Sequence, residues 1–160
     1  MRLPGQGGMA DVANLHQNFL MYLTRHSPLS LVHEVEIVSA GRGLASPEER
    51  RAAGLHPGEV RLVTNLGSFC QNPETRLLEL ESLHPGVSRE HLREQTGFEI
   101  ILADGFQESP PPTAEELRVL RTEIDPLGIR RLEFIPSKER TALIDELLRL
   151  EEGFIAEETR

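Results

Sequence analysis

The chain has 160 residues, of which 17 are basic and 26 are acidic, so its formal net charge is −9. This charge argues against nonspecific binding to nucleic acids and to anionic membranes, because a protein needs a basic surface to bind either of them. The single cysteine, Cys70, excludes a disulfide within the chain and disfavours a thiolate metal site. The length is enough for one domain with a hydrophobic core.

Apolar runs are short throughout the sequence. None reaches the roughly 20 residues that a helix needs to span a bilayer. Met1 leads into a glycine-rich loop instead of the apolar stretch of a secretory signal. We therefore predict a soluble, cytoplasmic protein with no membrane partner.

Three glycines, Gly5, Gly7 and Gly8, lie with Gln6 in a loop near the start of the chain. Residues 11–14 follow and are predicted to form the first turns of a helix. A glycine loop that leads into a helix exposes backbone N–H groups suited to an anion or an oxyanion. An ordinary turn is the alternative, and the third glycine of a dinucleotide-binding loop is missing.

A short apolar run at residues 19–23 predicts a strand that is covered on both faces. His26 follows this strand and is predicted to be exposed to solvent. The histidines lack the spacing of a helical metal-binding pair, so we predict no metal site. Between residues 31 and 38 the apolar spacing fits either a helix or a strand, and we favour a short helix or turn followed by extended chain.

The middle of the chain predicts a short helix and a hairpin. Ser46 fits an N-cap, Pro47 a first helical position and Gly54 a helix end, and the two arginines between them, Arg50 and Arg51, are expected on a solvated face. Residues 60–69 alternate and are rich in β-branched side chains, which predicts one strand. Turn residues at 72–75 join it to a second strand at residues 77–83.

A Pro-Gly corner at residues 84–86 ends the second strand. Ser88 then caps a short helix over residues 89–95, and Gly97 is predicted to be its C-cap. Residues 98–102 predict another strand, followed by a stiff, extended, proline-rich connection up to residue 112.

Two helices are predicted after the proline-rich connection. Thr113 and Glu116 form a capping box that begins a helix over residues 114–124. This helix is predicted to bury three apolar side chains at helical spacing, Leu117, Leu120 and Ile124. An amphipathic helix begins at Ser137, and its function is predicted to be packing, with partner binding as the alternative.

Four ordered segments carry a resemblance to a known family. Residues 82–88 (SLHPGVS), 96–99 (TGFE), 111–113 (PPT) and 124–126 (IDP) resemble the C-terminal half of a class I CoA-transferase B subunit. The glutaconate CoA-transferase B subunit is the most similar pattern, and the B subunit of the steroid ring-cleaving CoA hydrolase has similar segments. The resemblance covers residues 3–129.

The resemblance implies an α/β fold, a three-layer open sheet of the CoA-transferase/NagB type that is incomplete at the N-terminus, with additional C-terminal helices. It implies a division into residues 1–130, the C-terminal portion of a B subunit, and residues 131–160, an added amphipathic helix tail.

The family also implies roles for individual residues. Its Gly-x-Gly-Gly loop brings backbone amides close to the thioester carbonyl, so Gly7 and Gly8 are expected to stabilise the oxyanion, with Gly5 and Gln6 beside the substrate. Relatives have a polar residue near His26, which makes a substrate contact there the alternative to a solvated side chain. Asn65 stands where the family has Glu or Asp near the active site, and an amide cannot ionise. An Asn that caps a bend in a strand is the other interpretation.

The implied reaction transfers CoA between an acyl-CoA and a carboxylic acid, in a hetero-oligomer with an A subunit. CoA thioester is the substrate, and no bound cofactor is expected. The family uses a glutamate nucleophile, and its Ser-Glu-Asn-Gly segment does not occur in this sequence. We therefore expect the chain alone to be inactive. A steroid-ring-cleaving type CoA-ester hydrolase and a non-catalytic interaction module are the alternatives.

Overall fold

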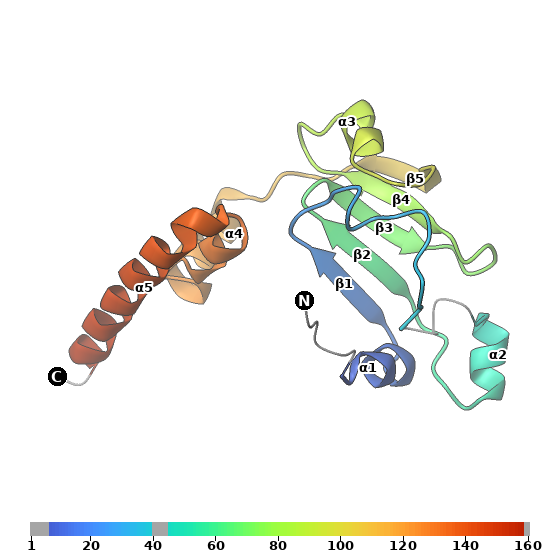
Figure 1. Cartoon of the computed structure of the whole chain (residues 1–160), viewed down its shortest axis with the longest axis horizontal. Helices are drawn as coiled ribbons and strands as arrows, with labels where there is room; N and C mark the ends of the chain where they lie inside the picture. The colour runs from blue at the N-terminus through green and yellow to red at the C-terminus, as the bar shows by residue number, and fades with distance from the viewer. Residues whose placement is uncertain (1–6, 40–44, 159–160) are drawn as a thin grey trace. The chain divides into compact units, whose positions relative to one another are not determined.

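The structure is a computed structural model that describes residues 7–39 and 45–158, with side chains up to residue 152. Contacts divide the chain into two compact units, Met1–Pro110 and Pro111–Arg160. The first unit holds a five-stranded sheet and short helices, and the second unit is helical (Figure 1). This arrangement confirms the predicted α/β class, whereas the predicted domain boundary at residue 130 stays a prediction.

The sheet has mixed strand directions, and its order follows the sequence, β1-β2-β3-β4-β5. β1 pairs parallel with β2, β3 is antiparallel to both of its neighbours, and β4 pairs parallel with β5. The carboxyl ends of β1, β2, β4 and β5 therefore meet at one edge of the sheet, beside the start of β3. The strands are β1 Phe19–Leu23, β2 Val60–Thr64, β3 Gly67–Gln71, β4 Leu78–Leu83 and β5 Ile101–Glu108.

The single strand predicted at residues 60–69 is wrong, because the chain reverses there to form β2 and β3. The Thr64 side chain makes the reversal, since its Oγ1 accepts hydrogen bonds from the N–H groups of Leu66 and Gly67 at 3.0 and 3.1 Å. The alternation of apolar and polar residues continues through this turn, so the two-residue period of the pattern did not indicate the chain reversal. The predicted hairpin around residues 72–75 is confirmed and joins β3 to β4.

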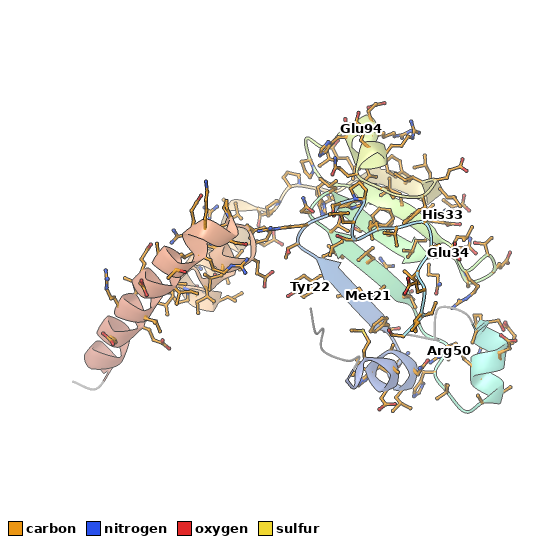
Figure 2. All side chains as sticks on the ribbon, in the orientation of Figure 1. Met21, Tyr22, His33, Glu34, Arg50 and Glu94 are labelled. Carbon is orange, nitrogen blue, oxygen red and sulfur yellow. The ribbon has the colours of Figure 1, made fainter. Side chains whose placement is uncertain are left out.

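The core lies on one face of the sheet. Leu62, Phe69 and Leu80 stand in register on β2, β3 and β4, and Leu92 of α3 (Arg89–Glu94) belongs to the same cluster. Met21 of β1 packs against this cluster. Tyr22 leaves β1 on the opposite side and is 71% exposed (Figure 2). The prediction that this strand is covered on both faces is thus wrong for the described residues.

Two short helices in the first unit begin as predicted. α2 (Pro47–Ala52) has a capping box between Ser46 and Glu49, and Ser88 caps α3 by accepting a hydrogen bond from His91 N–H. The predicted C-cap at Gly97 is wrong, because Gln95 takes that position. Gly97 N–H instead donates to Leu31 O at 2.7 Å, and a Cβ at residue 97 would lie 2.5 Å from that oxygen.

Arg50 is buried, which contradicts its predicted place on a solvated face. Only 2% of the residue is exposed, and Figure 2 labels its position. Its Nε donates to His56 O at 2.8 Å and its Nη2 donates to Asn14 O at 2.6 Å. Asn14 lies in the last turn of α1 (Met9–Leu15), where a cation also interacts favourably with the helix dipole. Arg50 therefore fastens α2 to the end of α1, whereas Arg51 is exposed as predicted.

We expect Arg50→Met to lower the free energy of unfolding by about 2 kcal/mol, because two backbone carbonyls lose their donor. Arg51→Met is the matched control, since its pair with Glu48 is exposed to solvent and contributes little to stability. Urea unfolding followed by far-UV circular dichroism measures both variants. Equal stabilities of the two variants would contradict the fastening role of Arg50.

The remaining segments differ from their predictions in detail. After a turn at Pro28 and Leu29, residues 31–39 form neither helix nor strand. β5 begins at Ile101, later than predicted, and continues through Asp104 and Gly105, where its register with β4 shifts. Gly105 has φ +80°, which permits this irregularity.

The second unit contains α4 (Ala114–Val119), which continues as the π-helix η2 (Leu120–Ile124), then the 3-10 helix η3 (Ile129–Glu133) and α5 (Ser137–Glu158). The capping box of Thr113 and Glu116 is confirmed. Leu117 and Leu120 are half-buried, but Ile124 is exposed, contrary to prediction. Across residues 7–39 and 45–158, no helix combines the length and the apolar character needed to cross a bilayer.

Candidate functional site

A hydrogen-bonded group of side chains lies at the carboxyl ends of the strands. We call it the carboxyl-edge network. It contains Thr64 at the end of β2, His26 after β1, His84 after β4 and Ser109 after β5, together with four hydrogen-bonded neighbours, Asn65, Ser68, Ser82 and Thr96. In open α/β sheets, ligands bind outside the carboxyl ends of the strands. This edge is therefore the candidate site.

His26 is the centre of the network and is only 5% exposed, so its predicted exposure to solvent is wrong. Its backbone N–H donates to Asn65 Oδ1 at 2.7 Å. Its ring nitrogens Nδ1 and Nε2 lie 3.0 Å from Thr64 Oγ1 and 2.9 Å from Thr96 Oγ1. His26 thus joins the loop after β1 to the β2–β3 turn and to the end of α3.

The hydrogen bonds of Thr96 favour the neutral tautomer of His26 with its proton on Nε2. Thr64 Oγ1 accepts two backbone N–H groups, and its single hydroxyl proton faces both Gly67 O at 3.2 Å and His26 Nδ1 at 3.0 Å. The Thr96 hydroxyl donates to Leu92 O at 2.7 Å and accepts from Nε2–H. Burial lowers the pKa of His26, and the charge of His91 lowers it further.

His84 and a row of hydroxyls form the second part of the network. His84 Nε2 donates to Thr64 O at 2.9 Å, which leaves Nδ1 to accept from Ser109 Oγ at 3.3 Å. Ser82 Oγ lies 2.8 Å from Ser109 Oγ and 3.1 Å from Ser68 Oγ. These bonds connect the ends of β3, β4 and β5 to the backbone of β2.

The chemistry of the network is that of neutral donors and acceptors. None of the described partners of His26, Thr64 or His84 is a carboxylate. Among the residues that the structure describes, no group of three or more metal-ligating side chains lies together. The network can orient a substrate by hydrogen bonds, but it does not itself provide a carboxylate nucleophile.

The predicted site residues fall into three groups. His26 and Asn65 are brought into direct contact at the carboxyl edge. Gly7 and Gly8 lie in an exposed turn that begins α1, and Figure 1 shows α1 at the opposite end of the sheet, where β1 begins. Gly5 and Gln6 lie outside the described residues. The role of the glycine loop in oxyanion stabilisation stays a prediction.

Comparisons with known proteins bear on the family. No protein-family model matches the chain. The chain is 31% identical over 121 residues to the B subunit of 3-oxoadipate CoA-transferase from Pseudomonas knackmussii, a match that covers 76% of this chain and 46% of the relative. The chain is a homologue of CoA-transferase B subunits. The family resemblance inferred from the sequence is thereby confirmed.

Solved structures and a second relative extend the comparison. The crystal structure of glutaconate coenzyme A-transferase from Acidaminococcus fermentans matches with a TM-score of 0.63 and 26% identity, over 79% of this chain and 48% of that chain. The decarboxylase AibA/AibB matches with a TM-score of 0.63 and 25% identity, over 82% and 48%. The cholesterol ring-cleaving hydrolase IpdB subunit of Mycobacterium tuberculosis is 31% identical over 109 residues, 68% of this chain and 43% of the relative. The chain spans about half the length of the curated relatives it matches.

Sequence reasoning on this B-subunit homologue missed Thr64, Thr96 and His84. Thr64 lies within the strand that was predicted at residues 60–69, so it was not identified as a turn residue. His84 was interpreted only as the start of a Pro-Gly corner. Thr96 carried a signal, because it lies in the segment TGFE that resembles the family. Their partners lie 20 to 70 positions away in the sequence, so no local pattern could pair them.

Substitution of Asn65 in this B-subunit homologue tests whether its hydrogen bond to His26 N–H stabilises the fold. We expect Asn65→Ala to lower the free energy of unfolding by about 1 kcal/mol, because His26 N–H loses its acceptor. Asn65→Asp retains a side-chain oxygen at this position, and we expect it to keep most of the stability. Thermal unfolding of both variants measures this difference. If the Ala variant unfolds at the wild-type temperature, the hydrogen bond does not stabilise the turn.

Proposed function

We propose that this chain is part of a CoA-transferase B subunit that moves CoA between an acyl-CoA and a carboxylic acid. The observation that carries the proposal is its 31% identity over 121 residues to the B subunit of 3-oxoadipate CoA-transferase. We further propose that it works in a hetero-oligomer with an A subunit. The names of the matched structures IpdAB and AibA/AibB, each with an A and a B component, support this assembly.

In this proposal the carboxyl-edge network fixes one wall of the active site. His26 and Thr64 hold the loop after β1 against the β2–β3 turn, which presents the exposed residue Asn65 at the edge. Asn65 would then orient the substrate by hydrogen bonds. Gly7 and Gly8 begin α1 at the opposite end of the sheet (Figure 1), so they do not belong to this wall, and their role at the thioester carbonyl stays a prediction of the family resemblance. CoA thioester is proposed as the substrate with no bound cofactor.

The nucleophile of the proposed reaction is a carboxylate, which forms a covalent intermediate with the acyl group. The carboxyl-edge network has no carboxylate among its described partners. We therefore propose that the attacking glutamate comes from a segment outside these 160 residues and that the chain alone does not turn over substrate.

A CoA-ester hydrolase is the second candidate function. The IpdB subunit is as similar in identity, 31%, as the CoA-transferase relative, although over 109 residues instead of 121. The amide of Asn65 favours this candidate, because it cannot ionise at a position where the resemblance to CoA-transferases implies Glu or Asp.

Product analysis separates the candidate reactions. The chain is assayed alone and together with an A subunit from the same genome, using acyl-CoA and a labelled free acid. Label that appears in a new CoA ester with the pair, and not with the chain alone, supports the transferase. A ring-opened acid would support the hydrolase, and release of carbon dioxide would support a decarboxylase like AibA/AibB. If the chain does not associate with any A subunit, the hetero-oligomer proposal fails.

A further inference from the structure

A cavity of about 430 Å³ lies at the amino ends of β4 and β5, away from the carboxyl-edge network. Cavities of this size are within the range that binds small molecules. Its lining is mostly apolar, and Arg76, His33 and Glu99 are its polar members; the apolar members are Val32, Leu77, Leu78, Phe98 and Ile101. Figure 2 labels His33 on the loop that forms one wall.

The walls of this cavity are fixed to one another by the described hydrogen bonds. Gly97 N–H donates to Leu31 O at 2.7 Å, which joins the segment before Val32 to the segment before Phe98. His26 Nε2 and Thr96 Oγ1, 2.9 Å apart, join the same two segments a few residues earlier. The cavity is therefore formed in advance, so that a ligand would not have to order its walls.

Arg76 has an unusual backbone conformation beside this cavity. Among the described residues it is the one non-glycine residue with a positive φ, +64°. Its N–H donates to Asn72 O at 3.0 Å, and its O accepts from Gln71 Nε2 at 2.7 Å, which hold it at the end of the hairpin loop. Gly or Asn is preferred at such a position, since a larger side chain costs free energy there. Strain of this kind is found where a side chain has a function.

From these two independent observations we infer that the cavity binds a small aliphatic carboxylate. Arg76 supplies the positive charge in the lining that recognises the carboxylate. The apolar residues Leu77, Leu78 and Phe98 contact the hydrocarbon tail. Glu99 lies in the same lining and is exposed, so its charge opposes the ligand at the entrance. This site is separate from the proposed transferase site and does not depend on it.

The test is a titration of the full ¹⁵N-labelled chain with sodium hexanoate, followed by NMR. We expect a dissociation constant of about 1 mM, as befits a ligand of this size, and shifts centred on residues 32–33, 76–78 and 98–101. Hexan-1-ol, which lacks the charge, and acetate, which lacks the tail, should each bind at least about tenfold more weakly.

Variants decide the role of each group. Arg76→Gly suits the positive φ and should remain folded, yet lose at least about tenfold in hexanoate affinity. Glu99→Gln should bind more tightly, because it removes the repelling charge. Arg89→Gln is the matched control, since Arg89 stacks on Phe106 outside this cavity, and it should bind as the wild type does. Absence of shifts, shifts elsewhere in the chain, or equal affinity of Arg76→Gly and the wild type would each overturn the inference.

Discussion

Gly67→Ala is expected to lower the free energy of unfolding of the first unit by about 3 kcal/mol, because the added methyl has no room. A Cβ at residue 67 would lie 2.4 Å from Ser82 O and 3.3 Å from Leu80 Cδ1. The first contact is with the backbone of β4, which pairs with β3, so the obstacle cannot rotate away. The methyl group would have to separate β3 from β4 beside the carboxyl-edge network.

Gly8→Ala is the matched control for this variant. Gly8 has φ −82°, and no atom lies within 4 Å of a Cβ placed there. We expect this control to unfold within about 0.5 kcal/mol of the wild type. The chain has one tyrosine, Tyr22, and no tryptophan, so tyrosine fluorescence anisotropy during urea unfolding reports on the first unit alone. If Gly67→Ala is as stable as Gly8→Ala, the close approach of β3 and β4 at this point is not real.

The features that sequence reasoning predicted correctly are those whose physics is local. The N-cap at Ser46 and the capping box of Thr113 with Glu116 involve residues three positions apart, and both appear in the structure as predicted. The hairpin at residues 72–75 follows from Asn72, whose side chain accepts from Glu74 N–H and Thr75 N–H. Such contacts lie within a single turn, so the sequence is enough to identify them.

The errors concern residues whose partners are distant in the sequence. Arg50 lies in a charged segment that is typical of a solvated helix face, and its burial is explained by hydrogen bonds to the carbonyls of His56 and Asn14. Gly97 lies close enough to the end of α3 to be its C-cap. In the structure, the absence of a side chain at Gly97 instead allows Leu31 O to lie close to its backbone. Tertiary contacts of this kind override local preferences.

The candidate site was predictable in part for the same reason. His26 and Asn65 were both identified from the resemblance to the family, and they lie in contact, although 39 positions separate them. Their role as a structural joint was not predicted, because it depends on Thr64 and Thr96, which carry no catalytic signal in the sequence. Two residues that the resemblance singled out as site candidates are therefore also part of a hydrogen-bonded structural contact.

The second large effect is expected from His26→Leu, which removes the centre of the carboxyl-edge network. We expect a loss of about 2 kcal/mol in the free energy of unfolding at pH 7.5, because the hydrogen bond from His26 Nε2–H to Thr96 and the polar contact of Nδ1 with Thr64 Oγ1 are both lost. The ring also contacts Phe69, with centroids 5.9 Å apart, and this packing is only partly replaced by leucine.

The contribution of His26 to the stability of the wild-type protein should decrease in acid, because the pKa of His26 is lowered in the folded state. The unfolded chain takes up a proton near the ordinary histidine pKa of about 6.5, whereas the folded protein does so only at lower pH. Between these two pKa values the unfolded state binds more protons, so stability decreases as the pH falls through this window and then levels off. Above about pH 6.5 the stabilisation is complete.

His26→Leu cannot bind this proton, so the difference in unfolding free energy between wild type and variant should shrink as the pH falls from 7.5 to 5. His91→Gln is the control that tests the cause, because the charge of His91 contributes to the lowered pKa, and its removal should narrow the window without closing it. Urea unfolding at a series of pH values, followed by Tyr22 anisotropy, measures all three proteins. A difference between wild type and His26→Leu that stays constant with pH would show that the folded protein does not lower the pKa of His26, and this prediction would then be wrong.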